Sequence, residues 1–435
     1  MAKMINKDLL IPIIISLLIL QLIMPSNSIT ATHLMTGATQ SNEIIEMIQQ
    51  INSTKLFSYV ETLTSFGVRY TGTDNCSKAG DWIYETFEQM GVTVQFHHWE
   101  YAGLKSRNVV ATIPGMDSSS DIEYLMTAHY DTTYGSIGAN DDGSGVAALL
   151  AIAEVLSQYT FPHTIRFIAF TAEEIGTYGS FCYARDAYRN QDNIRAVINP
   201  DIIGDAYTEE GGKYLRFFYP TRSKWIAEYA ENISQIYSDT IDLTVEILPN
   251  YIGADHQAFV DYGYDGVWIA QHDPSPYAHT LDDNCQNMNV SYFTKATKLL
   301  LAVIAELANE PVDLQIHIKT PYEGYAYLGS SPFIAMDLGK QWYSQWRGMT
   351  MIIGATMASV EVTTDQQIES VIFCIDGNFI TWDSTPPYEW RIEGKHFPLI
   401  GRHTLQTYVY TTTGNIAVDS MDVFILSINC QYNNW

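Results

Sequence analysis

Five side chains of the kinds that bind zinc follow short apolar runs or turns of this sequence. They are His129, Asp141, Glu174, Asp201 and His279. Imidazole nitrogens and carboxylate oxygens are the usual ligands of a catalytic Zn²⁺ ion. Each of the surrounding segments, taken alone, is also typical of an ordinary polar loop or a capped turn. The prediction of a metal site therefore depends on the combination of the five.

The first two polar segments bring histidine and aspartate close together in the chain. His129 is followed by Tyr130 and Asp131, and a carboxylate two residues after a metal-binding histidine can hold the ring in one tautomer. Asp141 and Asp142 stand in a glycine-rich turn ahead of a helical pattern. Adjacent carboxylates repel unless a cation or hydrogen bonds hold them. We therefore expect one of the pair to bridge two metals and the other to meet N–H groups at the helix start.

Two consecutive glutamates, Glu173 and Glu174, come directly after the apolar run 165–170. Successive residues can point in different directions, so one carboxylate can bind metal while the other holds the attacking water as a general base. Asp201 follows the strand-like run 196–200, and His279 lies in a loop ahead of a long helical pattern. In an α/β sheet, ligands gather at the carboxyl ends of the strands, which is where most of these side chains fall.

The segment 41–309 alternates helical and strand patterns, which predicts an α/β layered domain. The spacing predicts helices over 77–91, with Ser77 as the cap, over 146–159 and over 290–307. After Pro311 the pattern changes to short runs of period two separated by turn signals, which predicts a β-sandwich domain over 312–430. The turns and aromatic residues of this second part resemble those of immunoglobulin-like accessory domains.

The combined motifs resemble those of the co-catalytic zinc exopeptidases, which include secreted leucyl aminopeptidases, aminopeptidase Y and glutamate carboxypeptidase II. The resemblance covers residues 55–309 and rests on AHYD at 128–131, ANDDGSG at 139–145, AEE at 172–174, Asp201 and the HT pair at 279–280. It implies a three-layer α/β/α domain with a mixed central sheet.

The same resemblance implies a role for each matched residue and two zinc ions per chain. His129 and Asp201 would bind the first ion, Glu174 and His279 the second, and Asp141 would bridge them. Glu173 would be the general base, Asp131 would support His129, and Tyr251 would stabilise an oxyanion, although the context of this tyrosine is a looser match. Two zinc ions share and activate a water in such sites.

The function implied is that of an aminopeptidase acting on peptides with a free N-terminus. Three alternatives remain on the same fold: a glutaminyl cyclase-like acyltransferase, a carboxypeptidase, and a non-catalytic binding homologue. The complete set of five ligands disfavours the first and the third. The short stretch ahead of His129 lacks room for the inserted domain of the glutamate-releasing carboxypeptidases. Other histidines, among them His97, His256, His317 and His403, are expected to be structural or to lie behind the ligands.

The net charge of the chain and its first 28 residues indicate which partners and which cellular location to expect. The formal net charge of −26 argues against a nucleic-acid partner, because phosphate binding needs clustered Lys and Arg. Lys3 and Lys7 precede an apolar run over 9–24, which predicts a secretory signal over 1–28 that is either cleaved or kept as a membrane anchor. We therefore expect a secreted or cell-surface protein, and the sequence leaves its oligomeric state open.

Overall fold

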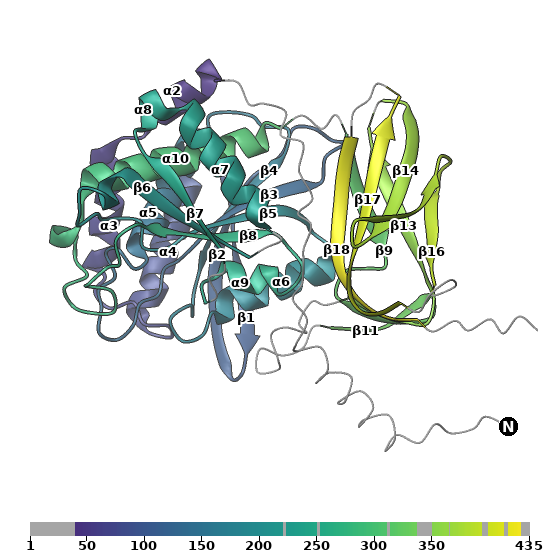
Figure 1. Ribbon diagram of the computed structural model, residues 1–435. Helices are drawn as coiled ribbons and strands as arrows, with labels where there is room; N and C mark the ends of the chain where they lie inside the picture. The colour runs from purple at the N-terminus through teal and green to yellow at the C-terminus, as the bar shows by residue number, and fades with distance from the viewer. Residues whose placement is uncertain are drawn as a thin grey trace, which may run out of the picture.

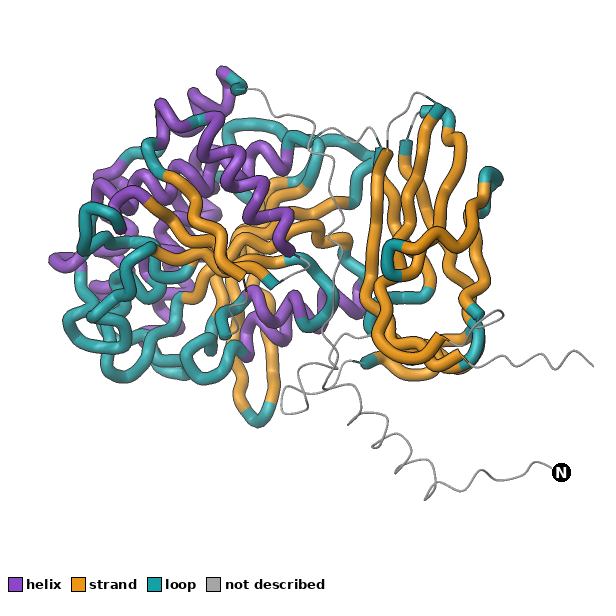
Figure 2. Tube along the Cα trace, viewed as in Figure 1, coloured by secondary structure: helices purple, strands orange, loops and turns teal. Residues whose placement is uncertain are grey.

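The structure, a computed structural model, describes residues 40–220, 223–249, 253–310, 314–336, 350–364, 366–393, 399–412 and 416–427. The predicted signal segment and Tyr251 lie outside these ranges. An α/β part comes first and a part built of strands alone follows it, as Figures 1 and 2 show. Among the described helices, none combines the length and the apolar composition that a membrane crossing needs.

An eight-stranded mixed sheet forms the middle of the α/β part, in the order β1-β2-β4-β3-β5-β8-β6-β7. Its strands are β1 (Thr93–Tyr101), β2 (Leu104–Ile113), β3 (Ile122–His129), β4 (Thr164–Phe170), β5 (Asn193–Pro200), β6 (Tyr214–Tyr219), β7 (Thr244–Pro249) and β8 (Gly266–Gln271). The three central strands β4, β3 and β5 run parallel, so their carboxyl ends meet at one edge of the sheet. The hairpin β1–β2 is antiparallel.

Helices cover both faces of this sheet. One face packs against α2 (Asn42–Gln50), α3 (Ser53–Ser65), α4 (Asp74–Gln89), α5 (Gly143–Leu156), α7 (Lys224–Ile236), α8 (Ser238–Ile241) and α10 (Val290–Ala308). The other face packs against α6 (Tyr178–Asn190) and α9 (His256–Val260). Alternate strand residues enter the two cores: Tyr124 and Met126 belong to the first, and Leu125 to the second. The expected three-layer α/β/α fold with a mixed sheet is confirmed.

Two helices begin three residues earlier than the sequence pattern predicts, and in α4 the cap is also a different residue. α4 begins at Asp74, since Thr73 and not Ser77 accepts a hydrogen bond from the backbone N–H of Cys76. α5 begins at Gly143, where the Asp142 carboxylate accepts from the Gly145 N–H. In both cases the polar side chain satisfies an N–H group that has no partner within the helix. Two 3₁₀ turns, η2 (Gly211–Lys213) and η4 (Cys285–Asn287), lie in connections.

The C-terminal part consists of two sheets. The larger has the order β11-β10-β12-β18-β17-β14-β15, and the smaller β16-β13-β9. The strands are β9 (Gln315–Thr320), β10 (Tyr325–Leu328), β11 (Ser331–Ala335), β12 (Thr350–Ile353), β13 (Thr356–Thr363), β14 (Ile368–Ile375), β15 (Asn378–Asp383), β16 (Tyr388–Ile392), β17 (Leu399–Thr411) and β18 (Ile416–Ser427). Both sheets contribute to a single core, for example through Val360 and Phe373, which is the arrangement of a sandwich. The immunoglobulin-like assignment and the predicted domain bounds stay predictions.

Candidate metal centre

The candidate ligands lie at the carboxyl edge of the three central strands. His129 is the last residue of β3, Asp201 directly follows β5, and the Glu173–Glu174 pair follows β4. Asp141 stands in the turn ahead of α5, and His279 lies in the loop between β8 and α10. The strand ends of a doubly covered sheet are the usual place for such a site, because loops rather than helices surround them.

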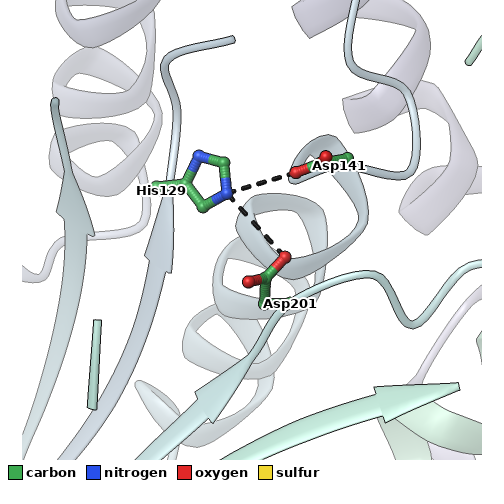
Figure 3. A group of neighbouring side chains, drawn as sticks. All are labelled: His129, Asp141 and Asp201. Carbon is green, nitrogen blue, oxygen red and sulfur yellow. Dashed lines mark ion pairs between the residues drawn. The ribbon is translucent and has the colours of Figure 1, made fainter. Parts of the chain in front are cut away.

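Two groups of potential ligands share Asp141. In the first, shown in Figure 3, His129 Nε2 lies 3.3 Å from Asp141 Oδ1 and 3.8 Å from Asp201 Oδ1. In the second, His279 Nε2 lies 3.2 Å from Asp141 Oδ2 and 3.1 Å from Glu174 Oε2. Each oxygen of Asp141 thus faces one group, which is the arrangement that a bridging carboxylate requires. The structure brings all five candidates together, while their roles as ligands stay predictions.

Backbone strain accompanies this arrangement. Three residues other than glycine adopt left-handed φ values at the site: Ala172 at 61°, Ile202 at 63° and His279 at 62°. Ala172 precedes Glu173, and Ile202 follows Asp201. Such values are unusual for any residue with a Cβ and are most unfavourable for a β-branched one such as Ile202. The fold therefore keeps strained positions next to the side chains that carry the predicted chemistry.

Asp131 links His129 to Glu173. The Nδ1 of His129 lies 3.2 Å from the Asp131 carbonyl oxygen and 3.6 Å from its carboxylate, so the carbonyl is the closer partner. A carbonyl only accepts, so Nδ1 donates to it, and Nε2 is the ring nitrogen that faces Asp141 and Asp201. The Asp131 carboxylate accepts from the Glu173 N–H at 3.2 Å and from the Thr71 hydroxyl at 2.9 Å. Asp131 thus contacts both His129, through its carbonyl, and the predicted general base Glu173, through its carboxylate.

The turn that carries Asp141 is held by a residue that the sequence did not single out. The buried Asp283 carboxylate accepts from the N–H groups of Asn140, at 2.8 Å, and of Asp141, at 3.1 Å. On the other side, Asp142 accepts from the His129 N–H at 3.2 Å while it caps α5. The Asp141–Asp142 peptide bond is cis.

A fully buried arginine, Arg69, also holds this turn in place. The Arg69 guanidinium donates to the carbonyl oxygens of Tyr130, Ile137 and Gly138 at 2.6–2.9 Å. These carbonyls flank the segment between His129 and Asp141. Burial lowers the pKa of Arg69, although four nearby acidic groups oppose that shift. The charge of this arginine partly balances the acidic cluster next to it.

Several carboxyl groups lie close together at the site, and their pKa values are shifted. Burial raises the pKa of Glu173 well above its usual value, and it raises that of Glu174 to about 7, with the Asp141 charge adding to the shift. Burial likewise raises the pKa of Asp255, whose charge faces those of Asp131 and Asp201, to about 7. The pKa of Asp141 is lowered instead, because the hydrogen bonds that it accepts from His129 and His279 outweigh the effect of burial.

Zinc fits the residues present. The described residues include two groups of three ligand atoms that all lie within 4.8 Å of one another. Glu174 Oε1 and Asp201 Oδ1 are buried oxygens that accept no hydrogen bond from the protein. Buried oxygens without a donor are costly unless a cation or water meets them. The mixed set of imidazole and carboxylate donors is the one that Zn²⁺ uses in catalytic sites.

The remaining histidines take structural positions. His97 pairs with Asp186 of α6 at 3.2 Å, which agrees with the expected structural role. In the β part, His317 and His403 face Asp419 and Asp376. His256 is fully buried, with its backbone N–H donating to the Asn199 side chain. Its neighbour Asp255 is the buried acid that sequence reasoning missed, although the Asp255-His256 pair was visible.

The fold and the candidate ligands agree with the predicted class of zinc metallopeptidases, and so do the comparisons with known proteins. Residues 108–304 match the profile of the family described as Peptidase family M28. A probable zinc metalloprotease of Pyricularia oryzae is 28% identical in an alignment that covers 60% of this chain and 65% of that protein. Leucine aminopeptidase 1 of Ajellomyces dermatitidis is 22% identical, covering 64% of this chain and 77% of the relative.

Solved structures agree in fold. The LapA aminopeptidase of Legionella pneumophila has a TM-score of 0.56 and 24% identity, covering 66% of this chain and 79% of that one. A glutaminyl cyclase of Bacteroides thetaiotaomicron has a TM-score of 0.51 and 22% identity, covering 59% and 98%. Residues 108–304 thus match a model of the kind of family that the resemblance implied.

Proposed function

We propose that this protein is a zinc-dependent aminopeptidase that removes the N-terminal residue of peptides. The observation that carries the proposal is the position of Asp141, whose two oxygens face two separate sets of ligand atoms. Two such sets describe a site for two zinc ions, with His129 and Asp201 on one side and Glu174 and His279 on the other. The relatives named as zinc metalloprotease and leucine aminopeptidase support the same activity.

Different residues of this chain would carry out the separate steps of hydrolysis. Bound zinc lowers the pKa of a water and polarises the scissile carbonyl. Glu173 lies beside these ligands, and its carboxylate is placed to take a proton from the water and pass it to the leaving amine. Asp131 holds the Glu173 backbone and the His129 ring in place. Tyr251, which we propose as the oxyanion donor, lies outside the described residues.

The glutaminyl cyclase alternative is the main competitor, because a solved cyclase shares the fold. Two sets of ligand atoms favour hydrolysis, since the cyclases that this family resembles work with a single zinc.

We also propose that the protein is exported and acts outside the cell or at its surface. The support is the sequence pattern of the first 28 residues, with two lysines followed by an apolar run. Expression of the full chain in its natural host, followed by sequencing of the N-terminus of the protein in the medium and in membranes, tests this. Protein that stays in the cytosol with residues 1–28 intact would contradict it.

The test of function is a substrate panel combined with elemental analysis. Purified protein is offered aminoacyl arylamides, γ-glutamyl compounds and peptides with N-terminal glutamine. We expect release of the aminoacyl group, loss of activity with a chelator, recovery with Zn²⁺, and two zinc ions per chain. Pyroglutamate formation without peptide hydrolysis, or a single zinc per chain, would overturn the assignment in favour of the cyclase.

A further inference from the structure

Helix α6 begins at the loop that carries the predicted general base. The Glu173 carbonyl accepts hydrogen bonds from the N–H groups of Gly176 and Thr177, both at 2.8 Å. The Ala172 carbonyl accepts from the Tyr178 N–H at 3.0 Å. Because the strained Ala172 and Glu173 are bonded to the first turn of α6, a displacement of this helix moves the Glu173–Glu174 loop with it.

The other end of α6 contacts the β part. Tyr188, in the last turn of the helix, is 7% exposed. Its ring lies 5.2 Å from that of Tyr262, which follows α9, and 5.7 Å from that of Tyr325 in β10, at a near-parallel angle of 29°. Offset aromatic pairs at such distances contribute about 0.5–1.5 kcal/mol each beyond their buried area. Figure 1 shows α6 at the side of the α/β part that faces the strands of the β part.

Two glycines show how close this contact is. A Cβ on Gly324 would lie 2.6–2.8 Å from the Tyr188 ring and hydroxyl. A Cβ on Gly263, just past Tyr262, would lie 2.5 Å from the Glu323 carboxyl group. Both glycines also have left-handed φ values, 74° and 90°. The two parts therefore approach each other here at distances that only residues without a side chain permit.

An electrostatic interaction acts across the same boundary. Burial acts to raise the pKa of Asp419 in β18, but His317, the Ile318 N–H and Arg195 of β5 together lower it. The Asp419 carboxylate accepts from the Ile318 N–H at 2.8 Å. Arg195 belongs to the central sheet, so its positive charge favours the docked position of β18 independently of the tyrosines.

The helix α9 links the same contact to the site by a second route. Asp255, whose buried carboxylate faces the charges of His129 and Asp201, directly precedes α9. Tyr262, at the other end of α9, packs against Phe181 of α6 at 6.1 Å and against Tyr188. Both helices of this face thus run from the candidate metal centre to the boundary with the β part.

We propose that the C-terminal β part positions the catalytic loop by holding the end of α6, with Tyr188 and Tyr325 as the positioning residues. This inference rests on the proposed function, because the positioned groups are Glu173 and Glu174. The β part is then an integral component of the peptidase in this chain and not a module tethered beside it. A displacement of about 1 Å at a catalytic group can lower a rate by about 100-fold.

The experiment compares Tyr325→Ala with Tyr325→Phe in the full-length zinc protein. Phenylalanine keeps the ring that meets Tyr188, so it should restore what alanine loses. Phe379→Ala is the matched control, because Phe379 is 61% exposed on the far edge strand β15 of the same sheet. For Tyr325→Ala we expect a fall in kcat on the order of 10- to 100-fold with little change in KM. Hydrogen exchange of residues 171–190 should rise, while Tyr325→Phe and Phe379→Ala stay near the wild type.

The exchange measurement separates this inference from the proposed function. If the wild-type protein proves inactive on peptides, the exchange of residues 171–190 still reports whether the β part holds α6. Unchanged kcat and unchanged exchange in Tyr325→Ala would overturn the inference while leaving the peptidase intact. Should Tyr325→Ala fail to fold, Tyr325→Leu, which removes the ring that meets Tyr188 but keeps apolar bulk, is measured in the same way. Wild-type exchange over residues 171–190 in that variant would equally overturn the inference.

Discussion

Among the five candidate ligands, His279 is the one whose side chain is open to solvent, since those of Asp141 and Glu174 are each 5% exposed. The His129 side chain is 2% exposed and that of Asp201 is 12% exposed, whereas the His279 side chain is 60% exposed. A buried group is enclosed by fixed hydrogen bonds, and an exposed one leaves room for a substrate to approach. We therefore expect peptides to reach the site from the side of His279.

Replacement of Glu173 by Gln tests the general base. The amide keeps the shape of the side chain but cannot accept a proton from water. We expect kcat to fall by about 10²–10⁴-fold, the usual contribution of a general base, while zinc content stays at the wild-type level. Steady-state hydrolysis of an aminoacyl arylamide, together with elemental analysis, checks both. Loss of zinc in this variant would assign Glu173 to the metal instead.

Replacement of Asp283 by Asn tests whether Asp283 holds Asp141, the predicted bridging ligand, in position. Asp283 accepts from the N–H groups of Asn140 and Asp141, and an amide can offer only one oxygen to them. We expect zinc affinity to fall about 10- to 100-fold, as for other residues that hold a metal ligand in place. Asp282→Asn is the matched control, since Asp282 is its exposed neighbour. Equal zinc affinities in a competition assay would contradict this role.

The types and order of the five candidate ligands were visible in the sequence because each follows an apolar run or a glycine-rich turn. The residues that hold them were not. Arg69 and Asp283 act through backbone groups that lie 61–69 and 142–143 positions away in the chain. No local pattern marks such a contact, because a lone Arg or Asp in a loop is ordinary. The strained φ values at Ala172 and Ile202 are equally invisible, since neither residue type favours them.

At the scale of elements, strands and helices were predictable where apolar spacing is regular, as in β3, β4 and α10. The helix starts were less so. A glycine-rich first turn hides the start of α5, and Ser77 competes with Thr73 as a cap for α4. Which residue caps the helix depends on the path of the preceding loop, and tertiary contacts determine that path.

The first turn of α6 offers a test of element packing. A Cβ on Gly179 would lie 2.2 Å from the Thr171 carbonyl oxygen and 2.6 Å from Asn108 Oδ1. Both are fixed by hydrogen bonds, because Asn108 accepts from the Thr171 N–H and donates to the Gly179 carbonyl. We expect Gly179→Ala to lower the free energy of unfolding by about 1–3 kcal/mol. Gly212→Ala, with no atom within 4 Å, is the control in the same denaturant titration.

His163 should make the junction of β4 and α10 sensitive to acid. Its Nε2 meets the Glu310 carbonyl at 2.8 Å, so Nε2 donates and Nδ1 accepts from the Ser120 hydroxyl at 2.6 Å. Both contacts suit the neutral ring, and burial lowers its pKa. The unfolded chain therefore binds the proton more readily, and stability falls as the pH drops below about 6.5. In His163→Asn, the loss of stability from about pH 7.5 to about pH 5.5 should be smaller; equal losses would contradict the assignment.

At the scale of the whole molecule, the change from an α/β to an all-β pattern after Pro311 was readable from the sequence, because the apolar period changes there. The contact between the two parts was readable only in part. The tyrosine-rich segment 322–327 indicates either packing between the parts or a strand of the sandwich. Its partners Tyr188 and Tyr262 satisfy the local patterns of a helix and a turn, and nothing in those patterns distinguishes a tyrosine that packs across the boundary from one at the surface.

The net charge of −26 leads to a prediction for the entire molecule. A strongly acidic protein attracts cationic peptides and repels anionic ones over distances comparable to the Debye length, which falls from roughly 20 Å at about 0.02 M salt to roughly 4 Å at about 0.5 M. For a dipeptide pair such as Leu-Lys and Leu-Glu, we expect kcat/KM to fall with added salt for the first and to rise for the second. The change should be several-fold in kcat/KM, with kcat nearly constant, because salt screens the encounter and not the chemistry. Parallel salt responses of the two peptides would show that the acidic groups lie away from the path to the site.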